Sequence, residues 1–539
     1  MGNYSIEKGV LVVEDGVTKL PRNPYANGFI GKGYFQDELD IIEVKLPSTL
    51  KSIGDWAFLG CKNLKTIEIP NSVTQIENLV FSKCESLEEI VVPDSVSKMQ
   101  DRVFENCKKL KKVKLSKKIK NIPLKTFSGC ESLEEVWFSD NLNSFESNCF
   151  YGCKNLKELH IPKKVSNIEY DAFEGCSGLE RITVDEANET FRSVAGSNAV
   201  LKGTQLVLGC KNTVIPEGTT VIGALAFSGC AELKSISIPE GVTEIRTGAF
   251  SNCSSLEEIY LPSTLEKIGD ECFVGCYKLS RIYVDKKNKT ISSGKEDKVL
   301  ISDNRLLYFV GTDIPADEDF EEIDKDAFNK LGMTELIIPE GVKRFGKLNF
   351  YREESTRVDE LGVEQIEYKA FPLRKLSIPS TVEEIDADFF PYLSNWAIKD
   401  IDEIEVSEKN KYYDSRNNCN AIIDSKNNTL ILACKNTVIP EGVVSVNCRL
   451  ISENGVKNLT IPKSVKQIEK LMGQIDEMVI LGDAIDPLNT EDLKVKRICA
   501  SKTIIEILKK DFENRSAFRN LFNSSSKGSD EGTIEFVEL

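Results

Sequence analysis

The chain has 539 residues, more than a single globular core normally accommodates, so a stack of repeats or several domains is expected. Its 69 Lys and Arg against 85 Asp and Glu give a formal net charge of -16, which argues against a general nucleic-acid-binding protein and against binding to anionic membranes. No apolar run approaches the roughly 20 residues that a spanning helix needs, so we expect no membrane insertion.

The first 40 residues do not follow the pattern that dominates the rest of the chain, and we expect residues 1–40 to form an N-terminal cap. Met1 to Asp15 contain no basic region followed by an apolar stretch, so we expect no signal peptide and a cytoplasmic location. A secreted or cell-surface location is the alternative if a leader has already been removed.

A repeat of 23 residues begins after this segment and is marked by cysteine. The repeating cysteines are Cys61, Cys84, Cys107, Cys130, Cys153 and Cys176, and again Cys230, Cys253 and Cys276. Within one unit, Ile67 and Ile69 alternate with outward neighbours as in a β-strand, and Pro70 ends that strand because proline cannot donate to a ladder. The period predicts a solenoid over residues 41–482, an α/β repeat that is mostly β.

The strand spacing Leu64-x-x-Ile67-x-Ile69 is that of a leucine-rich repeat. Residues 53–61, Ile-Gly-Asp-Trp-Ala-Phe-Leu-Gly-Cys, and the similar residues 222–230 closely resemble the BspA-like class of bacterial leucine-rich repeats, as does the segment from Cys434 to Gly442. The resemblance implies a curved solenoid with one parallel sheet and a surface or secreted protein that binds other proteins. It carries over no catalytic residue, so we expect neither enzyme activity nor a cofactor.

Three segments interrupt the 23-residue repeat and resemble one another: residues 185–213, 285–320 and 407–437. Each has an asparagine near its start (Asn188, Asn288 and Asn410) and two later apolar runs around a polar turn, which predicts a β-hairpin added to the stack.

The pattern also weakens further along the chain. Residues 351–360 are charged enough to predict a loop. Residues 483–539 are expected to form a C-terminal cap, with one helix over residues 503–522 and a short strand over 533–539.

The 16 cysteines raise the question of metal or disulfide chemistry. Nine of them occupy one position of the repeat, where a small apolar side chain is needed and free cysteine serves well. Side chains of one ladder point the same way, so we expect buried free thiols and no metal site. The only histidine, His160, has no accompanying zinc or triad motif and is expected to be a solvated surface residue.

Eight lysines between residues 108 and 120 suggest a site for a polyanion. However, Glu88 and Glu89 lie one repeat before Lys111 and Lys112, and Glu134 and Glu135 lie one repeat after. We therefore predict an alternating charge ladder that stabilises the strand register, in which most of the local field cancels.

One outward strand position is enriched in aromatic residues and histidine, with arginines nearby, although a sheet surface has no structural need for them. This composition is typical of interface hot spots, and the alternative is that aromatic residues merely suit β-strands. The candidate partner-binding residues are Trp137, His160, Arg181, Tyr260, Arg281 and Tyr283.

From these features we predict a non-enzymatic, monomeric protein that recognises a protein partner, or a host or bacterial surface, through the strand face or the hairpin insertions. A cytoplasmic structural scaffold without a dedicated ligand is the alternative. A hydrolase would need paired acids or an activated nucleophile in a cleft, and none stands out from the repeat.

Overall fold

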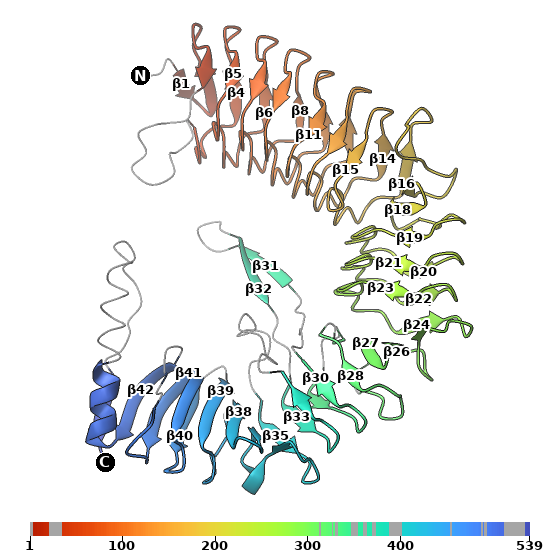
Figure 1. Ribbon diagram of the computed structural model, residues 1–539. Helices are drawn as coiled ribbons and strands as arrows, with labels where there is room; N and C mark the ends of the chain where they lie inside the picture. Colours follow the sequence, from red (N-terminus) through yellow and green to blue (C-terminus); the bar gives the residue numbers. More distant parts are fainter. Residues whose placement is uncertain are drawn as a thin grey trace. The chain divides into compact units, whose positions relative to one another are not determined.

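Each 23-residue repeat contributes two short strands that stack on those of the next repeat (Figure 1). The computed structural model describes residues 4–20, 35–311, 314–325, 327–328, 333–346, 354–358, 364–368, 373–386, 401–452, 455–486, 489, 493–510 and 534–539. It divides into two compact units, Met1–Ser293 and Gly294–Leu539.

In the first unit, strands of three or four residues form one series of parallel pairings, which we call the long ladder. Its strands are β4 (Glu43–Lys45), β6 (Thr66–Glu68), β8 (Glu89–Val91), β10 (Lys112–Lys114), β12 (Glu135–Trp137), β14 (Glu158–Ile161), β16 (Arg181–Val184), β20 (Ser235–Ser237), β22 (Glu258–Leu261) and β24 (Arg281–Val284). Within each sheet of this series, neighbouring strands pair with a 23-residue offset, so that Lys112 lies opposite Glu89 and Glu135. Among the described residues, β6 and β8 do not pair, nor do β12 and β14.

Strands of two residues form a second series, which we call the short ladder. Its strands in the first unit are β3 (Lys19–Leu20), β5 (Ser52–Ile53), β7 (Gln75–Ile76), β9 (Lys98–Met99), β11 (Asn121–Ile122), β13 (Ser144–Phe145), β15 (Asn167–Ile168), β19 (Val221–Ile222), β21 (Glu244–Ile245) and β23 (Lys267–Ile268). The leucine-rich-repeat solenoid is confirmed, but the parallel strands form several separate sheets in two series instead of the one sheet that the resemblance implied.

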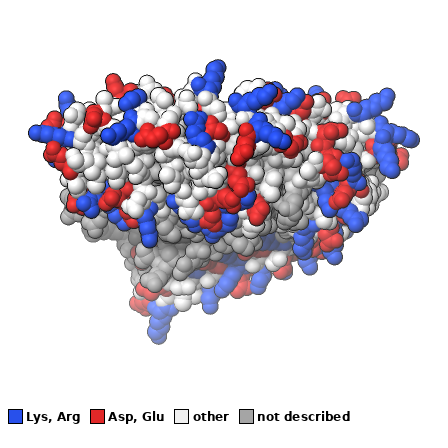
Figure 2. Space-filling model, turned by 90° about the horizontal axis from the view of Figure 1, so that it is seen from below, with Lys and Arg blue, Asp and Glu red and all other residues white. Residues whose placement is uncertain are grey.

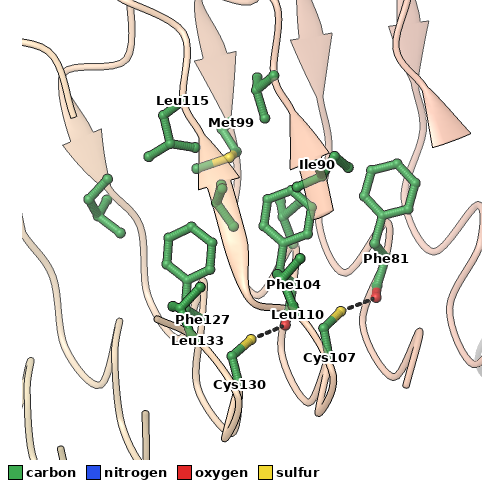
Figure 3. Close-up of a cluster of buried hydrophobic side chains, with 14 of the residues drawn as sticks. Phe81, Ile90, Met99, Phe104, Cys107, Leu110, Leu115, Phe127, Cys130 and Leu133 are labelled. Carbon is green, nitrogen blue, oxygen red and sulfur yellow. Dashed lines mark hydrogen bonds between the residues drawn. The ribbon is translucent and has the colours of Figure 1, made fainter. Parts of the chain in front are cut away.

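The core between the ladders is built from columns of identical side chains (Figure 3). Phe58, Phe81 and Phe104 stack with ring centroids 5.6 and 5.7 Å apart. Beside them, the thiol of Cys107 donates a hydrogen bond to the carbonyl of Phe81 at 3.1 Å. The same bond, 26 residues back along the chain, is made by Cys61, Cys84, Cys130, Cys153, Cys176, Cys253 and Cys276. All 16 cysteines are buried and free, as predicted.

The three predicted hairpin insertions are present. Their strand pairs are β17 (Val200–Lys202) with β18 (Gln205–Leu208), β26 (Val299–Ser302) with β27 (Arg305–Phe309), and β37 (Ala421–Asp424) with β38 (Thr429–Cys434). The second strand of each hairpin then pairs in parallel with the next strand of the stack, so the insertion continues the solenoid.

The asparagine near the start of each insertion joins the insertion to the preceding repeat through hydrogen bonds. The side-chain amide of Asn288 donates to the carbonyls of Pro262 and Leu265 at 3.0 and 2.9 Å, and its oxygen accepts the N–H groups of Thr290 and Ile291. Asn188 and Asn410 make the equivalent four bonds. All four bonding positions of the amide are therefore used, which is why asparagine recurs here.

In the second unit the strands lengthen toward the C-terminus. They are β28 (Glu322–Ile323), β29 (Glu335–Ile337), β30 (Arg344–Phe345), β33 (Lys375–Ile378), β34 (Glu384–Ile385), β35 (Glu403–Val406), β36 (Tyr413–Asp414), β39 (Ser445–Ile451), β40 (Val456–Ile461), β41 (Gln467–Ile480), β42 (Leu493–Ala500) and β43 (Glu535–Glu538), with one 3-10 turn at Arg416–Asn418. Parallel pairing continues past residue 482 through β42 and β43. The bounds predicted for the two caps and the solenoid remain predictions.

The loop predicted over residues 351–360 is wrong for residues 354–358. These form β31 (Glu354–Val358), which pairs antiparallel with β32 (Glu364–Tyr368). Both segments contain β-branched residues (Thr356, Val358 and Ile366), whose preference for strands outweighs the effect of the charged residues around them.

Near the two ends, the described residues add one hairpin and one helix. β1 (Tyr4–Glu7) and β2 (Val10–Val13) form an antiparallel hairpin, and β2 pairs with β4. The last strand of the first compact unit is β25 (Ile291–Ser292). Residues 502–510 are helical, as predicted, and the rest of the predicted helix, residues 511–522, lies outside the described residues.

Candidate partner-binding face

The outward side chains of the long ladder in the first unit form a surface that we call the strand face. Val91, Trp137 and Tyr260 are 58%, 49% and 42% exposed, and His160 is exposed as well, whereas Tyr283 is half-buried. Because strand residues alternate in direction, Ile90, Val113 and their equivalents face the core while these residues face away from it. The structure therefore places the predicted aromatic column on the outside.

Tyr260 and Tyr283 lie opposite each other on β22 and β24 and form a stacked pair. Their ring centroids are 4.6 Å apart and their planes differ by 13°. The Tyr260 hydroxyl donates to a carboxylate oxygen of Glu258 at 3.0 Å, and Arg281 donates to the Tyr283 hydroxyl at 2.9 Å. The hydrogen bond to Glu258 also raises the pKa of Tyr260, because it favours the neutral phenol. Both rings are thus held in place by neighbouring side chains.

The other three predicted residues form a different arrangement. The ring nitrogen Nδ1 of His160 lies 3.0 Å from the hydroxyl of Thr183, and Arg181 lies 3.8 Å from the carboxylate of Glu158. Trp137 is not joined to them, because within residues 35–311 β12 pairs with β10 and β14 pairs with β16, but β12 and β14 do not pair. This interruption was not predicted from the sequence.

The interruption coincides with a larger inward side chain. Phe138 stands where neighbouring units carry Val92, Leu115 and Ile161, and it is only half-buried. Its ring packs edge-on against Phe145 and Phe150, at centroid distances of 5.4 and 6.0 Å. Phe138 thus lies at the break that separates Trp137 from the patch around His160. Its size alone does not explain such breaks, because within residues 35–311 β6 and β8 do not pair either and carry only Ile69 and Val92 at this position.

On the strand face, the residues around Arg181 and those around Arg281 are related by an offset of 100 residues. Glu158 and Arg181 correspond to Glu258 and Arg281. The two residues of each pair lie opposite each other, and each arginine lies on the strand of the long ladder that directly precedes an insertion. Sequence reasoning found the aromatic residues but missed the acidic partner beside each arginine. The equal offset of the two pairs is the signal that could have revealed it.

Charge on the molecular surface is mixed. On the face that Figure 2 shows, Lys and Arg are interspersed with Asp and Glu. The predicted charge ladder is present, because Lys112 lies between Glu89 and Glu135 and Lys111 lies 3.2 Å from Glu88.

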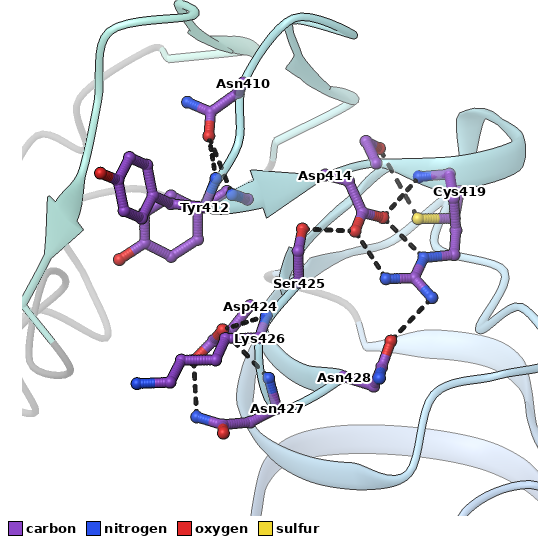
Figure 4. A network of polar contacts seen from close by, with 12 residues as sticks. Asn410, Tyr412, Asp414, Cys419, Asp424, Ser425, Lys426, Asn427 and Asn428 are labelled. Atoms are coloured by element: carbon purple, nitrogen blue, oxygen red, sulfur yellow. Dashed lines mark hydrogen bonds and ion pairs between the residues drawn. The ribbon is translucent and has the colours of Figure 1, made fainter.

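The third insertion contains a polar network with a structural role (Figure 4). The guanidinium of Arg416 makes two bonds to Asp414, at 2.6 and 2.7 Å, and one to Asn428, and the hydroxyl of Ser425 also donates to Asp414. Burial raises the pKa of Asp414, but the bonds from Arg416 and Ser425 outweigh it and keep this pKa below its ordinary value. A carboxylate that accepts this many bonds from its neighbours is well suited to a structural role.

Metal binding and membrane insertion are two further possibilities for the described part of the chain. No group of three or more His, Cys, Asp or Glu side chains is placed there to hold a metal ion. Nor does any helix among the described residues have the length and apolar character needed to cross a membrane.

Comparison with known proteins agrees with this architecture. The family described as "BspA type Leucine rich repeat region (6 copies)" matches residues 28–130, 99–206, 207–295 and 311–420. No curated protein matches the chain.

Solved structures are similar over much of the chain. A leucine rich cell surface protein from Faecalibacterium prausnitzii is 23% identical, with a TM-score of 0.44 over 75% of this chain and 92% of that one. A leucine-rich repeat protein from Eubacterium ventriosum is 17% identical, with a TM-score of 0.40 over 77% and 96%. The pneumococcal vaccine antigen PcpA is 19% identical, with a TM-score of 0.32 over 92% and 96%. On its repeat sequence, which the family matches over most of its length, this chain belongs to the BspA-type leucine-rich repeat family.

Proposed function

We propose that the protein is a non-enzymatic binding protein that recognises a protein partner, in an adhesion-like role, through the strand face. The family supports this proposal, because repeat solenoids offer extended surfaces that suit protein recognition. The observation that carries it is the outward-facing, stacked pair of Tyr260 and Tyr283.

The physical basis is preorganisation. Aromatic side chains and arginine supply much of the binding energy at interfaces, and rings that are already ordered lose less conformational entropy when a partner docks. The hydrogen bonds from Tyr260 to Glu258 and from Arg281 to Tyr283 provide that order. The acid and the arginine also present charges of both signs, which can select a complementary partner.

The test begins by immobilising the full-length protein and capturing proteins from extracts of cell surfaces and extracellular matrix. A captured protein is identified, purified and titrated against wild type, Tyr260→Ala and Tyr283→Ala. Truncating a hot-spot tyrosine costs about 2 kcal/mol, so we expect the dissociation constant to rise about 30-fold.

Tyr170→Ala is the matched control, because Tyr170 is 64% exposed and lies in a turn outside the strand face. We expect it to change the dissociation constant by less than about twofold. Equal affinities for wild type and both strand-face variants would rule out this site. If the immobilised wild type captures no protein that the Tyr260→Ala/Tyr283→Ala double variant does not also capture, the scaffold hypothesis is favoured.

A further inference from the structure

A second surface of the first unit carries a groove that the strand face does not include. The groove has a volume of about 1060 Å³ and lies along the short ladder at β9 and β11. Its charged lining consists of five lysines, Lys98, Lys117, Lys118, Lys120 and Lys164, and two acids, Asp101 and Glu146. The excess of positive charge is unexpected in a chain whose formal net charge is -16.

A proline accounts for the position of the groove. At the equivalent place in neighbouring units, the N–H groups of Glu77, Gln100 and Glu146 each donate to the preceding unit at 3.0 Å. Pro123 occupies this place after β11 and has no N–H, so the equivalent bond to the carbonyl of Met99 cannot form. Within residues 35–311 the short ladder is interrupted here: β9 pairs with β7, and β11 pairs with β13.

The lysines of the groove are less neutralised than those of the charge ladder. Lys117 lies 3.7 Å from Asp94, and Lys164 donates to the side-chain oxygen of Asn141 at 2.9 Å. Lys98, Lys118 and Lys120 are exposed and make no ion pair with any residue that the structure describes. The run of lysines between residues 108 and 120 is thus divided, with Lys111 and Lys112 in the charge ladder and Lys117, Lys118 and Lys120 in the groove.

We propose that this groove binds a sulfated polysaccharide. Its lining combines ammonium groups with the neutral side chains of Asn78, Gln100, Asn121 and Asn141, and amide side chains can both donate to and accept from hydroxyl groups. Asp101 and Glu146 would repel a continuous rod of negative charge but can accept hydrogen bonds from sugar hydroxyls. The lining therefore matches a chain in which anionic groups are separated by hydroxyls.

Other anionic ligands fit less well. The groove-lining residues include no aromatic side chain on which a base could stack, which disfavours single-stranded nucleic acid. The two-residue strands of the short ladder offer too few backbone groups to bind a peptide by strand addition. The basic lining residues are all lysine, whose ammonium group is a compact point charge that can pair with a sulfate from any direction.

The test measures binding of the full-length protein to dextran sulfate, with unsulfated dextran, polygalacturonate and poly-uridylate as comparison ligands. We expect dextran sulfate to bind and the three comparison ligands to bind at least about tenfold more weakly. Lys118→Gln/Lys120→Gln should weaken binding of dextran sulfate by about tenfold or more and reduce its dependence on salt, because two contacts with the anion are lost. The matched control Lys111→Gln/Lys112→Gln removes the same charge from the same run and should weaken binding less than about twofold.

Thermal unfolding of both double variants verifies that each is folded. Equal weakening by the two double variants would show general charge attraction and overturn the site. Equal or tighter binding of poly-uridylate would identify a nucleic-acid surface instead, and equal binding of polygalacturonate would overturn the preference for sulfate. Failure of wild type to bind dextran sulfate would overturn the proposal while leaving the strand-face proposal untouched, because the two surfaces share no residue.

Discussion

The repeated cysteine combines three properties that no other side chain offers together at this position. It is small, it is tolerated in an apolar core, and its thiol can donate weakly to a carbonyl. In the column around Cys107 the thiol donates to the Phe81 carbonyl of the preceding unit, while the phenylalanine rings stack alongside. Alanine would lose the donor and leave a void, and serine would bring a more polar group into the core.

The buried thiols make stability fall at alkaline pH. Burial raises the pKa of Cys176 from 9.0 to about 12. Between these values the thiol is ionised in the unfolded chain but protonated in the folded one, so stability is complete below pH 9 and declines as the pH rises through this window. Cys176→Ala should therefore make the free energy of unfolding less dependent on pH by about 1.4 kcal/mol per pH unit.

Urea unfolding of wild type and Cys176→Ala between pH 8 and 10.5 measures this difference. The two curves should be parallel below pH 8.5 and converge above pH 9.5. If they remain parallel throughout, the thiol titrates as in the unfolded chain and its burial is contradicted.

Gly175 and Gly229 lie where two repeats stack directly on each other although they are far apart in the sequence. Gly175 donates its N–H to the carbonyl of Ser228 at 3.1 Å, across the first insertion. Gly229 has a φ of +73°, and a Cβ added to it would lie 2.4 Å from the Cα of Gly175. Gly229→Ala should lower the free energy of unfolding by more than about 2 kcal/mol, because backbone strain and a backbone clash add together.

Gly152→Ala separates these two effects. Gly152 has nearly the same φ, +70°, but an added Cβ would meet no atom within 4 Å. Strain alone should then cost about 1 kcal/mol. Chemical denaturation of the two variants gives the comparison, and equal losses would mean that the units do not stack as described.

At the scale of elements, the hairpin insertions could be predicted because two apolar runs around a polar turn are a local signal. The bonds that anchor each insertion could not, because Asn188, Asn288 and Asn410 contact carbonyls of the preceding unit, 23 to 31 residues back in the chain. The break in the short ladder has a cause in the sequence, because Pro123 lacks the donor that its equivalents use. The breaks in the long ladder could not be predicted, because in the described part of the chain β6 and β8 do not pair although both carry only aliphatic residues at the position of Phe138.

Charge reversal tests the register of the long ladder. Lys112→Glu places a carboxylate between Glu89 and Glu135 on the two adjacent strands. Like charges directly opposite each other destabilise by about 0.2–1 kcal/mol per pair, so the melting temperature should fall at low salt and recover at high salt.

Lys114→Glu is the matched reversal on the same strand, because Lys114 lies opposite Val91 and Trp137, which carry no charge. It should lower the melting temperature less than Lys112→Glu. An unchanged melting temperature for Lys112→Glu at low salt would contradict the register.

At the scale of the whole molecule, the 23-residue period was sufficient to predict a solenoid, because each unit depends only on its neighbours. The division into units at Ser293 and Gly294 was not predicted, since repeats on both sides follow similar local patterns. The candidate site was predicted in part. The alternation of strand residues placed Tyr260 and Tyr283 outward and adjacent. The bond from Tyr260 to Glu258 and the bond from Arg281 to Tyr283, which order the rings, depend on rotamers that the sequence does not specify.

The most direct test of the strand-face proposal is to find where the partner contacts the protein. A photo-crosslinking residue is placed at Tyr283 on the strand face, at Tyr170 outside it, or at Val214, which is 67% exposed next to the first insertion. Each variant is irradiated with the captured partner, and cross-linked chains are counted by mass spectrometry. We predict cross-links from position 283 and background levels from the other two; cross-links from position 214 or 170 without any from 283 would contradict the proposal.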